Sequence, residues 1–227
     1  MVDIETWMNE FTEKLVSEFG PRLLFLGLQG SYGRGEANED SDIDVVAVLD
    51  RAELADLDAY RAIVREMPEG EKACGFLCGA RELKNWPKYD LLAVARDTRD
   101  VRGSLADLLP SFCRDDLADA AAIGASGLYH AAVHTYLYAD REGWPGFLKE
   151  AHKGAFFTLR ALHELRAGEN VRAKRDLLPL LSGEEREILA YSLSPGGEPL
   201  EDVFARLVRW SAAAMAEAES AKDTKFP

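Results

Sequence analysis

The first 110 residues mix the apolar spacing of helices with that of strands. Residues 3–19 repeat a large apolar side chain every fourth position and predict an amphipathic helix. Residues 23–28 and 45–49 are short apolar runs bounded by turn residues, which is the pattern of strands. A further helix is expected over residues 51–67 and a further strand over residues 73–79. Together these segments predict a small β-sheet flanked by helices.

Helical spacing alone continues beyond residue 110. Long helices are expected over residues 115–138, 145–166 and 200–221. Helices of this number and length form a bundle. We therefore expect an α/β (α+β) fold, in which a small mixed β-sheet domain over residues 1–110 is followed by an α-helical bundle domain over residues 111–227.

The composition narrows the class of protein. The chain has 227 residues, 47% of them hydrophobic, which is enough for a sizeable core. Three cysteines without zinc-site spacing argue against a secreted disulfide framework, and we find no basic leader or long apolar run. The net charge of −13 disfavours binding of long nucleic acid, which needs a basic surface. We expect a cytoplasmic protein without a membrane or nucleic-acid partner.

Two aspartates open the second strand. In the segment SDID at residues 41–44, Asp42 and Asp44 are two positions apart, so their carboxylates share one face of the strand while Ile43 points into the core. Two carboxylates on one face repel each other unless a cation lies between them. Mg²⁺ suits such a pair, because it binds one or two carboxylates together with water and substrate phosphates. Asp42 and Asp44 are therefore candidate Mg²⁺ ligands.

A glycine-rich turn, GSYGRG at residues 30–35, precedes the two aspartates. Glycines let the backbone approach a ligand closely, and N–H groups at such a turn point at an anion. Ser31 adds a hydroxyl donor, and Arg34 adds a guanidinium suited to phosphate. Glycine-rich hairpin loops are common, and an isolated D-x-D can be a solvated rim or a Ca²⁺ site. Both together favour a nucleoside-triphosphate site, with Gly30, Ser31 and Arg34 on the phosphates.

The motif G-S-x-G-R-G followed by S-D-I-D resembles the signature of the DNA polymerase β-like nucleotidyltransferase superfamily. Within it, the chain looks most like the minimal and antibiotic-modifying members of kanamycin, streptomycin and lincosamide type. The resemblance covers roughly the first half of the chain. It implies an enzyme that transfers AMP from ATP, with Mg²⁺, to a hydroxyl of a small molecule such as an aminoglycoside-like antibiotic. It also implies that Asp42 and Asp44 are catalytic.

The chain departs from this family at one place. Related enzymes often carry a third carboxylate on the next strand, where it binds metal or deprotonates the acceptor, but residues 73–79 read ACGFLCG. Glu82 lies just past that strand, and Asp90 and Asp97 lie at the two ends of the apolar run 91–95, which we expect to be another strand. We rank Asp97 first as the third catalytic acid, because an Asp-Thr ending a strand suits a site loop. Each of the three could instead be a surface or capping acid.

Two features of the helical half could reach the site. The segment around Gly168 and Lys174 is similar to streptomycin-type enzymes, in which a lysine at this place contacts the nucleotide phosphates; a solvated lysine is the alternative. His130 and His134 lie four residues apart on one helix face, a spacing that can hold a metal or place a base. A histidine could deprotonate the acceptor, since this helix lacks the glutamate of the kanamycin-type enzymes. We favour the simpler interpretation, partly buried packing residues.

Two other functions stay open beside small-molecule transfer, which ranks first. A degenerate nucleotide-binding or regulatory module ranks second, because the strand at residues 73–79 has no acid. A protein-modifying antitoxin that adenylylates a partner ranks third. The acidic chain suits a cationic acceptor. The oligomeric state is open, and a homodimer is among the options.

Overall fold

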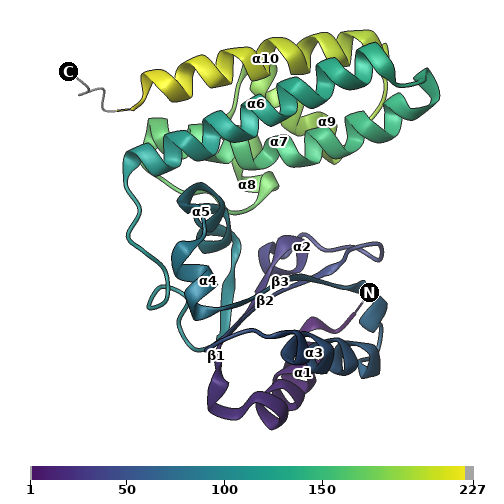
Figure 1. Ribbon diagram of the computed structural model, residues 1–227. Helices are drawn as coiled ribbons and strands as arrows, with labels where there is room; N and C mark the ends of the chain where they lie inside the picture. Colours follow the sequence, from purple (N-terminus) through teal and green to yellow (C-terminus); the bar gives the residue numbers. More distant parts are fainter. Residues whose placement is uncertain (1, 223–227) are drawn as a thin grey trace. The chain divides into compact units, whose positions relative to one another are not determined.

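The computed structural model describes residues 2–222. The chain forms two compact units, Met1–Ser111 and Phe112–Pro227. We call them the sheet unit and the helical unit (Figure 1).

The sheet unit alternates helices and strands. Its elements in chain order are α1 (Ile4–Phe19), β1 (Leu23–Gln29), α2 (Gly30–Arg34), β2 (Ile43–Leu49), α3 (Leu54–Glu66), β3 (Ala73–Gly79), α4 (Ala80–Asn85), α5 (Lys88–Asp97) and β4 (Arg99–Arg102). The described residues form one four-stranded sheet of order β3-β2-β1-β4. Strand β1 runs antiparallel to β2 and β4, whereas β3 runs parallel to β2. The mixed sheet and its first three strands are thus confirmed.

Helices cover both faces of this sheet. Figure 1 shows α1 and α3 on one face and α2, α4 and α5 on the other. The predicted stripe of α1 buries Trp7, Phe11 and Leu15 in a cluster with Ile43 and Val45 of β2. Ile43 is fully buried, as the alternation of the strand predicted. The two carboxylates that flank Ile43 are thereby kept out of this cluster.

One expected strand is wrong. Residues 91–95 belong to helix α5, which buries Leu91 and Leu92 and leaves the rest of that run only partly covered. A short apolar run fits a helix that is buried on one side as well as it fits a strand. The fourth strand is instead β4, which pairs with β1 at the edge of the sheet. Its sequence RDVR has a single apolar residue and therefore carries almost no strand signal.

The helical unit contains the three predicted long helices and two shorter ones in its described part. Its elements in chain order are α6 (Arg114–Tyr138), α7 (Trp144–Ala167), α8 (Lys174–Leu177), α9 (Gly183–Leu193) and α10 (Leu200–Ser220). Helix α6 packs against both α7 and α10, and α9 packs against α7. Among residues 2–222, no helix combines the length and the apolar character needed to cross a bilayer.

We predict that Leu15→Ala lowers the free energy of unfolding of the sheet unit by about 2–5 kcal/mol, because it leaves a cavity in a closed core. Leu15 is fully buried. The matched control is Leu54→Ala in the same unit, where the side chain is 75% exposed and the loss should stay within about 0.5 kcal/mol. Chemical denaturation followed by tryptophan fluorescence measures both. Equal losses would contradict the assigned core.

Candidate active site

The glycine-rich segment connects β1 to the short helix α2 next to β2. In the antiparallel pair of β1 and β2, Gln29 lies opposite Asp44, so Gly30 comes directly beside this carboxylate. A Cβ atom on residue 30 would overlap the carboxylate of Asp44, and the φ angle of Gly30 is +67°. Both constraints require glycine at this position. The expected turn is largely helical, since α2 spans Gly30–Arg34 and ends at Gly35 in the left-handed conformation.

Asp42 and Asp44 lie on either side of the first residue of β2. Asp42 precedes the strand and is exposed, whereas Asp44 belongs to the strand and is half-buried. Burial raises the pKa of Asp44 above its ordinary value, and the negative charges of Asp42 and Asp97 raise it further, while Arg34 opposes them. Three carboxylates and one guanidinium are therefore close enough to influence one another.

Asp97 is the acid that meets the glycine-rich segment. It ends α5, and only 1% of its surface is exposed. Its Oδ2 atom accepts a hydrogen bond from the backbone N–H of Gly30 at 3.1 Å and another from Nη1 of Arg34 at 2.6 Å. Since Gly30 and Arg34 are the first and last residues of α2, one buried carboxylate holds both ends of this helix.

Glu36 also belongs to the site, although the sequence analysis did not identify it. Its carboxylate accepts a hydrogen bond from Nε of Arg34 at 3.0 Å, and its side chain is 15% exposed. The guanidinium of Arg34 is thus shared between Asp97 and Glu36. Nothing in the local sequence distinguishes Glu36 from the exposed acids that follow it, such as Glu39 and Asp40. The contact with Arg34 does.

The two other candidates for the third acid have the contacts of surface residues. Glu82 on α4 accepts a hydrogen bond from its neighbour Arg81 at 3.0 Å. Asp90 is exposed on α5 and accepts a bond from the indole N–H of Trp86 at 3.3 Å. In the described part of the chain, Asp97 is the candidate that bonds to the glycine-rich segment.

The helical unit carries the remaining predicted residues. Lys174 begins α8, and its ammonium nitrogen lies 5.7 Å from the ring centre of Phe156; its contact with nucleotide phosphates stays a prediction. His130 and His134 are exposed on α6, with ring centres 6.1 Å apart. The expectation that they are partly buried packing residues is therefore wrong. Helix α6 buries small residues on its opposite side, Ala121 among them.

Comparison with known proteins gives a family and a fold. Residues 8–110 match the family model of the nucleotidyltransferase domain. Among solved structures, the chain is similar to the crystal structure of spectinomycin adenyltransferase AAD(9) from Enterococcus faecialis, which was determined with ATP and spectinomycin. The two share 14% sequence identity and a TM-score of 0.59, over 93% of this chain and 99% of that chain. No curated protein matches the sequence.

The two comparisons agree with each other and with the geometry. The family match lies within the sheet unit and contains the glycine-rich segment and Asp42, Asp44 and Asp97. The structural likeness extends over nearly the whole chain and so shows the fold of both units, a nucleotidyltransferase core followed by helices. Residues 8–110 are therefore a nucleotidyltransferase domain, and the protein is an enzyme of the nucleotidyltransferase class.

Proposed function

We propose that the protein is a Mg²⁺-dependent nucleotidyltransferase that moves AMP from ATP to a hydroxyl group of a small molecule. The observation that carries this proposal is the close approach of Gly30 to the carboxylate of Asp44, with Asp42 and Asp97 beside it. An aminoglycoside-like acceptor fits a chain of net charge −13, because such molecules are cationic. The name of the structural relative, which includes spectinomycin, supports the same class of acceptor. Antibiotic resistance would follow from such a reaction.

The donor set fits Mg²⁺. Within residues 2–222, no three His, Cys, Asp or Glu side chains are grouped to hold a metal by themselves. Mg²⁺ does not need such a group, because it commonly takes one or two carboxylates and completes its shell with water and phosphate oxygens. Asp42 and Asp44 would supply those carboxylates. Burial raises the pKa of Asp44 and the charges of Asp42 and Asp97 raise it further, and a bound divalent cation would favour the ionised carboxylate against both effects.

The same residues suit the triphosphate. The Ser31 hydroxyl and backbone N–H groups of the glycine-rich segment would donate to phosphate oxygens, and Gly30 lets that backbone lie against Asp44. Arg34 would add positive charge beside them, oriented by Asp97 and Glu36. We keep Lys174 as a proposed phosphate contact from the helical unit.

The reaction needs a hydroxyl oxygen to bond to the α-phosphorus while the bond to the β-phosphate oxygen breaks and pyrophosphate leaves. Bound Mg²⁺ would neutralise the charge that develops on the phosphate oxygens. The hydroxyl proton must pass to a base. Asp97 was our first candidate as a catalytic acid or base, but its Oδ2 atom is already bonded to Gly30 and Arg34. These contacts favour a positioning role, in which Asp97 keeps α2 in place.

Free cysteines support the proposed cytoplasmic location. Cys74 and Cys113 are exposed and Cys78 is buried, and none of the three forms a disulfide. Exposed free thiols are typical of a reducing compartment.

One observation favours a second candidate, a degenerate nucleotide-binding module. Strand β3 lies next to β2 in the sheet, with Cys74 opposite Asp44, and it carries no acid. A screen for pyrophosphate release with ATP and GTP separates the candidates. It would test aminoglycosides, lincosamides and other small alcohols as acceptors. Mg²⁺-dependent release with one acceptor supports transfer, whereas ATP binding without release across the panel favours the module. Co-purification with a small helical toxin would instead favour the antitoxin function.

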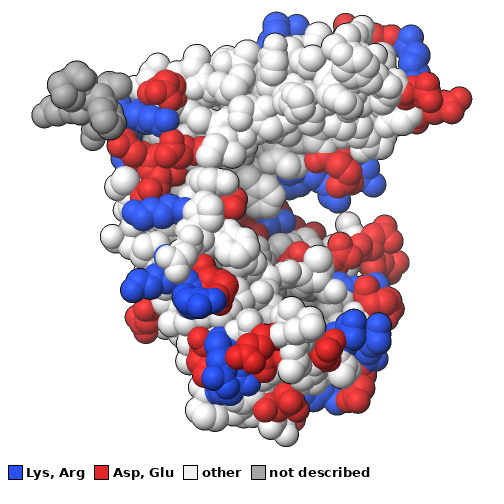
Figure 2. Space-filling view, in the orientation of Figure 1, with Lys and Arg blue, Asp and Glu red and all other residues white. Residues whose placement is uncertain are grey.

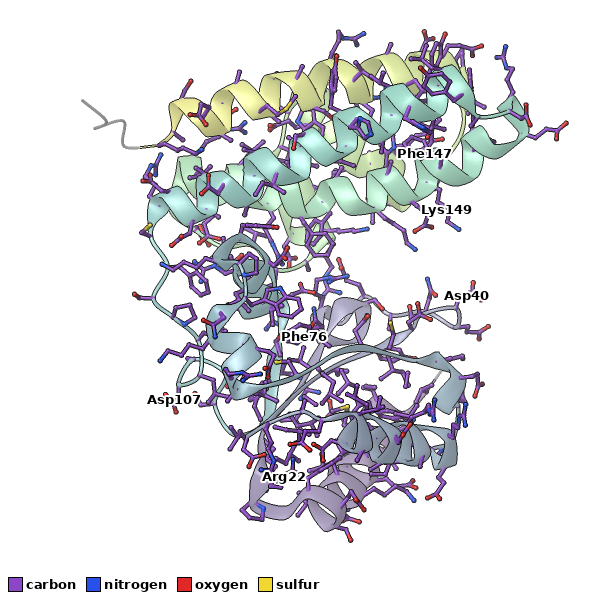
Figure 3. The ribbon with its side chains drawn as sticks, viewed as in Figure 1. Arg22, Asp40, Phe76, Asp107, Phe147 and Lys149 are labelled. Atoms are coloured by element: carbon purple, nitrogen blue, oxygen red, sulfur yellow. The ribbon has the colours of Figure 1, made fainter. Side chains whose placement is uncertain are left out.

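Asp42→Asn and Asp44→Asn should each lower turnover by about 1,000-fold, because a lost metal ligand removes several kcal/mol of charge stabilisation. Folding should persist, as circular dichroism would show. The control is Asp40→Asn, an exposed acid at the outer end of the connection from α2 to β2 (Figure 3). It should keep turnover within about twofold. An active Asp44→Asn protein would exclude the metal role.

Asp44→Asn should also raise the free energy of unfolding at pH 7. The pKa of Asp44 is raised in the folded protein, so its ionised form is less favourable there than in the unfolded chain. The gain should shrink as the pH falls and vanish below the ordinary aspartate pKa of 3.8, where both states are protonated. Denaturation between pH 3 and 7 measures the effect, with Asp40→Asn as the variant that should not show it. A stability loss at pH 7 would contradict the prediction.

Asp97→Ala should lower the free energy of unfolding of the sheet unit by about 2 kcal/mol, because it removes the buried carboxylate that accepts hydrogen bonds from the backbone N–H of Gly30 and from Nη1 of Arg34. It leaves Arg34 with Glu36 as its carboxylate partner. Asp97→Asn keeps one oxygen that can accept a hydrogen bond from Gly30 or Arg34, so its loss of unfolding free energy should be smaller. Both variants should weaken Mg²⁺–ATP binding, which calorimetry would measure. The matched control is Asp90→Asn, an exposed acid of the same helix. Unchanged ATP affinity in Asp97→Ala would exclude the positioning role.

A further inference from the structure

Helix α6 presents an uncharged, largely apolar surface to solvent. Residues 120–139 include no Lys, Arg, Asp or Glu, although such residues make up 30% of the chain. Several large apolar side chains of this helix are exposed, namely Ile123 (44%), Tyr129 (37%), Tyr136 (46%), Leu137 (62%) and Tyr138 (76%). Figure 2 shows a broad area without charged residues across the helical unit. A helix that is apolar on its outer as well as its inner face is expected to have a partner on both.

The exposed residues of α6 follow the spacing of a helix-pairing seam. Ile123, Gly127, His130, His134 and Leu137 are separated by four, three, four and three residues, and we call them the α6 seam. This alternation places side chains in one line along a helix and is the repeat by which two helices pack together. His130 and His134 are exposed in the middle of it. The seam therefore gives these two histidines a role that the active site does not.

Gly127 is the glycine of α6 that packing within the chain does not require. Gly124 in the same helix is required by internal packing, because a Cβ atom there would overlap the hydroxyl of Thr158. A Cβ atom on Gly127 would meet nothing within 4 Å. A glycine in the middle of a helix costs about 1 kcal/mol relative to alanine. A bare backbone at the seam leaves room for a bulky side chain of another molecule.

We propose that the α6 seam is a homodimer interface in which α6 of a second copy packs antiparallel across it. A two-fold axis near the centre of the seam brings the Ile123 end of one copy to the Leu137 end of the other, so apolar residues meet. It also brings Gly127 to His134 of the second copy, so the smallest residue of the seam meets a large one, and it places the two copies of His130 at the axis. Each half of the seam therefore complements the other half, which a two-fold interface requires.

A hollow beside the seam adds to this complementarity. It measures about 320 Å³ and lies between α6 and α10. Its walls are lined by Val133, Tyr136, Leu137, Phe204, Ala205 and Val208, with Glu201 at the polar end. Glu201 is paired with Arg141, so this end is neutralised within the chain. The hollow can take an apolar side chain of α6 of the second copy, in this register Ile123, which faces Leu137.

A second copy fits this surface better than other partners do. A nucleic acid or an anionic membrane surface requires Lys and Arg, which residues 120–139 lack. Two copies of a chain with net charge −13 repel each other least where both surfaces are uncharged. The seam spans about 21 Å, since 14 residues rise about 1.5 Å each. A contact of this length is at the small end of stable interfaces, so we expect a dissociation constant on the order of micromolar.

A charge exchange across the two ends of the seam tests the proposal. Ile123→Lys and Leu137→Glu, made singly, should each weaken dimerisation at least about tenfold, because each leaves a charge facing an apolar residue. The double variant should restore the dimer, because Lys at 123 then faces Glu at 137 of the second copy. Within one helix these positions are too far apart to pair. Analytical ultracentrifugation of the full chain measures the association.

The control variant is Leu180→Lys, which adds a charge at a residue 55% exposed on another element of the helical unit and should leave association unchanged. Circular dichroism should show that all variants are folded. A wild-type chain that stays monomeric up to about 200 µM would overturn the proposal, because a weak dimer of this size forms below that concentration. Equal association of wild type and single variants would overturn it too, as would a double variant that associates no better than the single ones.

Discussion

The candidate active site depends on one close approach, between the backbone of Gly30 and the carboxylate of Asp44. The antiparallel pairing of β1 and β2 brings the end of one strand to the beginning of the other. Any side chain at residue 30 would collide with the carboxylate, so the glycine is what allows the glycine-rich segment and Asp44 to lie against each other. The buried carboxylate of Asp97 then fixes this segment through Gly30 and Arg34.

This arrangement concentrates negative charge. Ionisation of Asp44 is therefore unfavourable, because burial and the charges of Asp42 and Asp97 raise its pKa. Arg34 compensates part of it, shared between Asp97 and Glu36. The remaining negative charge is what a bound divalent cation would offset. The site is therefore less stable without its ligands than a neutral core would be, which is common where function requires charged groups to lie together.

In the helical unit, the main feature is the packing of helix α6. This central helix packs between α7 and α10 with small residues, because alanines let the neighbouring helices approach closely. The outer face of α6 is apolar as well, so amphipathic spacing is weak along this helix. A surface of that kind accounts for exposed aromatic residues and histidines in a chain that is otherwise strongly acidic.

Local patterns in the sequence were enough to propose the core of the candidate site. Asp42, Asp44 and the glycines are close in the chain, and the two-residue period of a strand decides their relation without any distant contact. The sequence identified Asp97 as a candidate, but it did not show which residues Asp97 contacts. It reaches Gly30 across 67 residues, and the run before it fits a strand or a one-sided helix equally well. The contact of Glu36 with Arg34 and the exposure of His130 and His134 became known only from the tertiary structure. The partner of a surface acid and the covered side of a weakly amphipathic helix depend on which distant elements pack against them, and the order of residues does not contain that information.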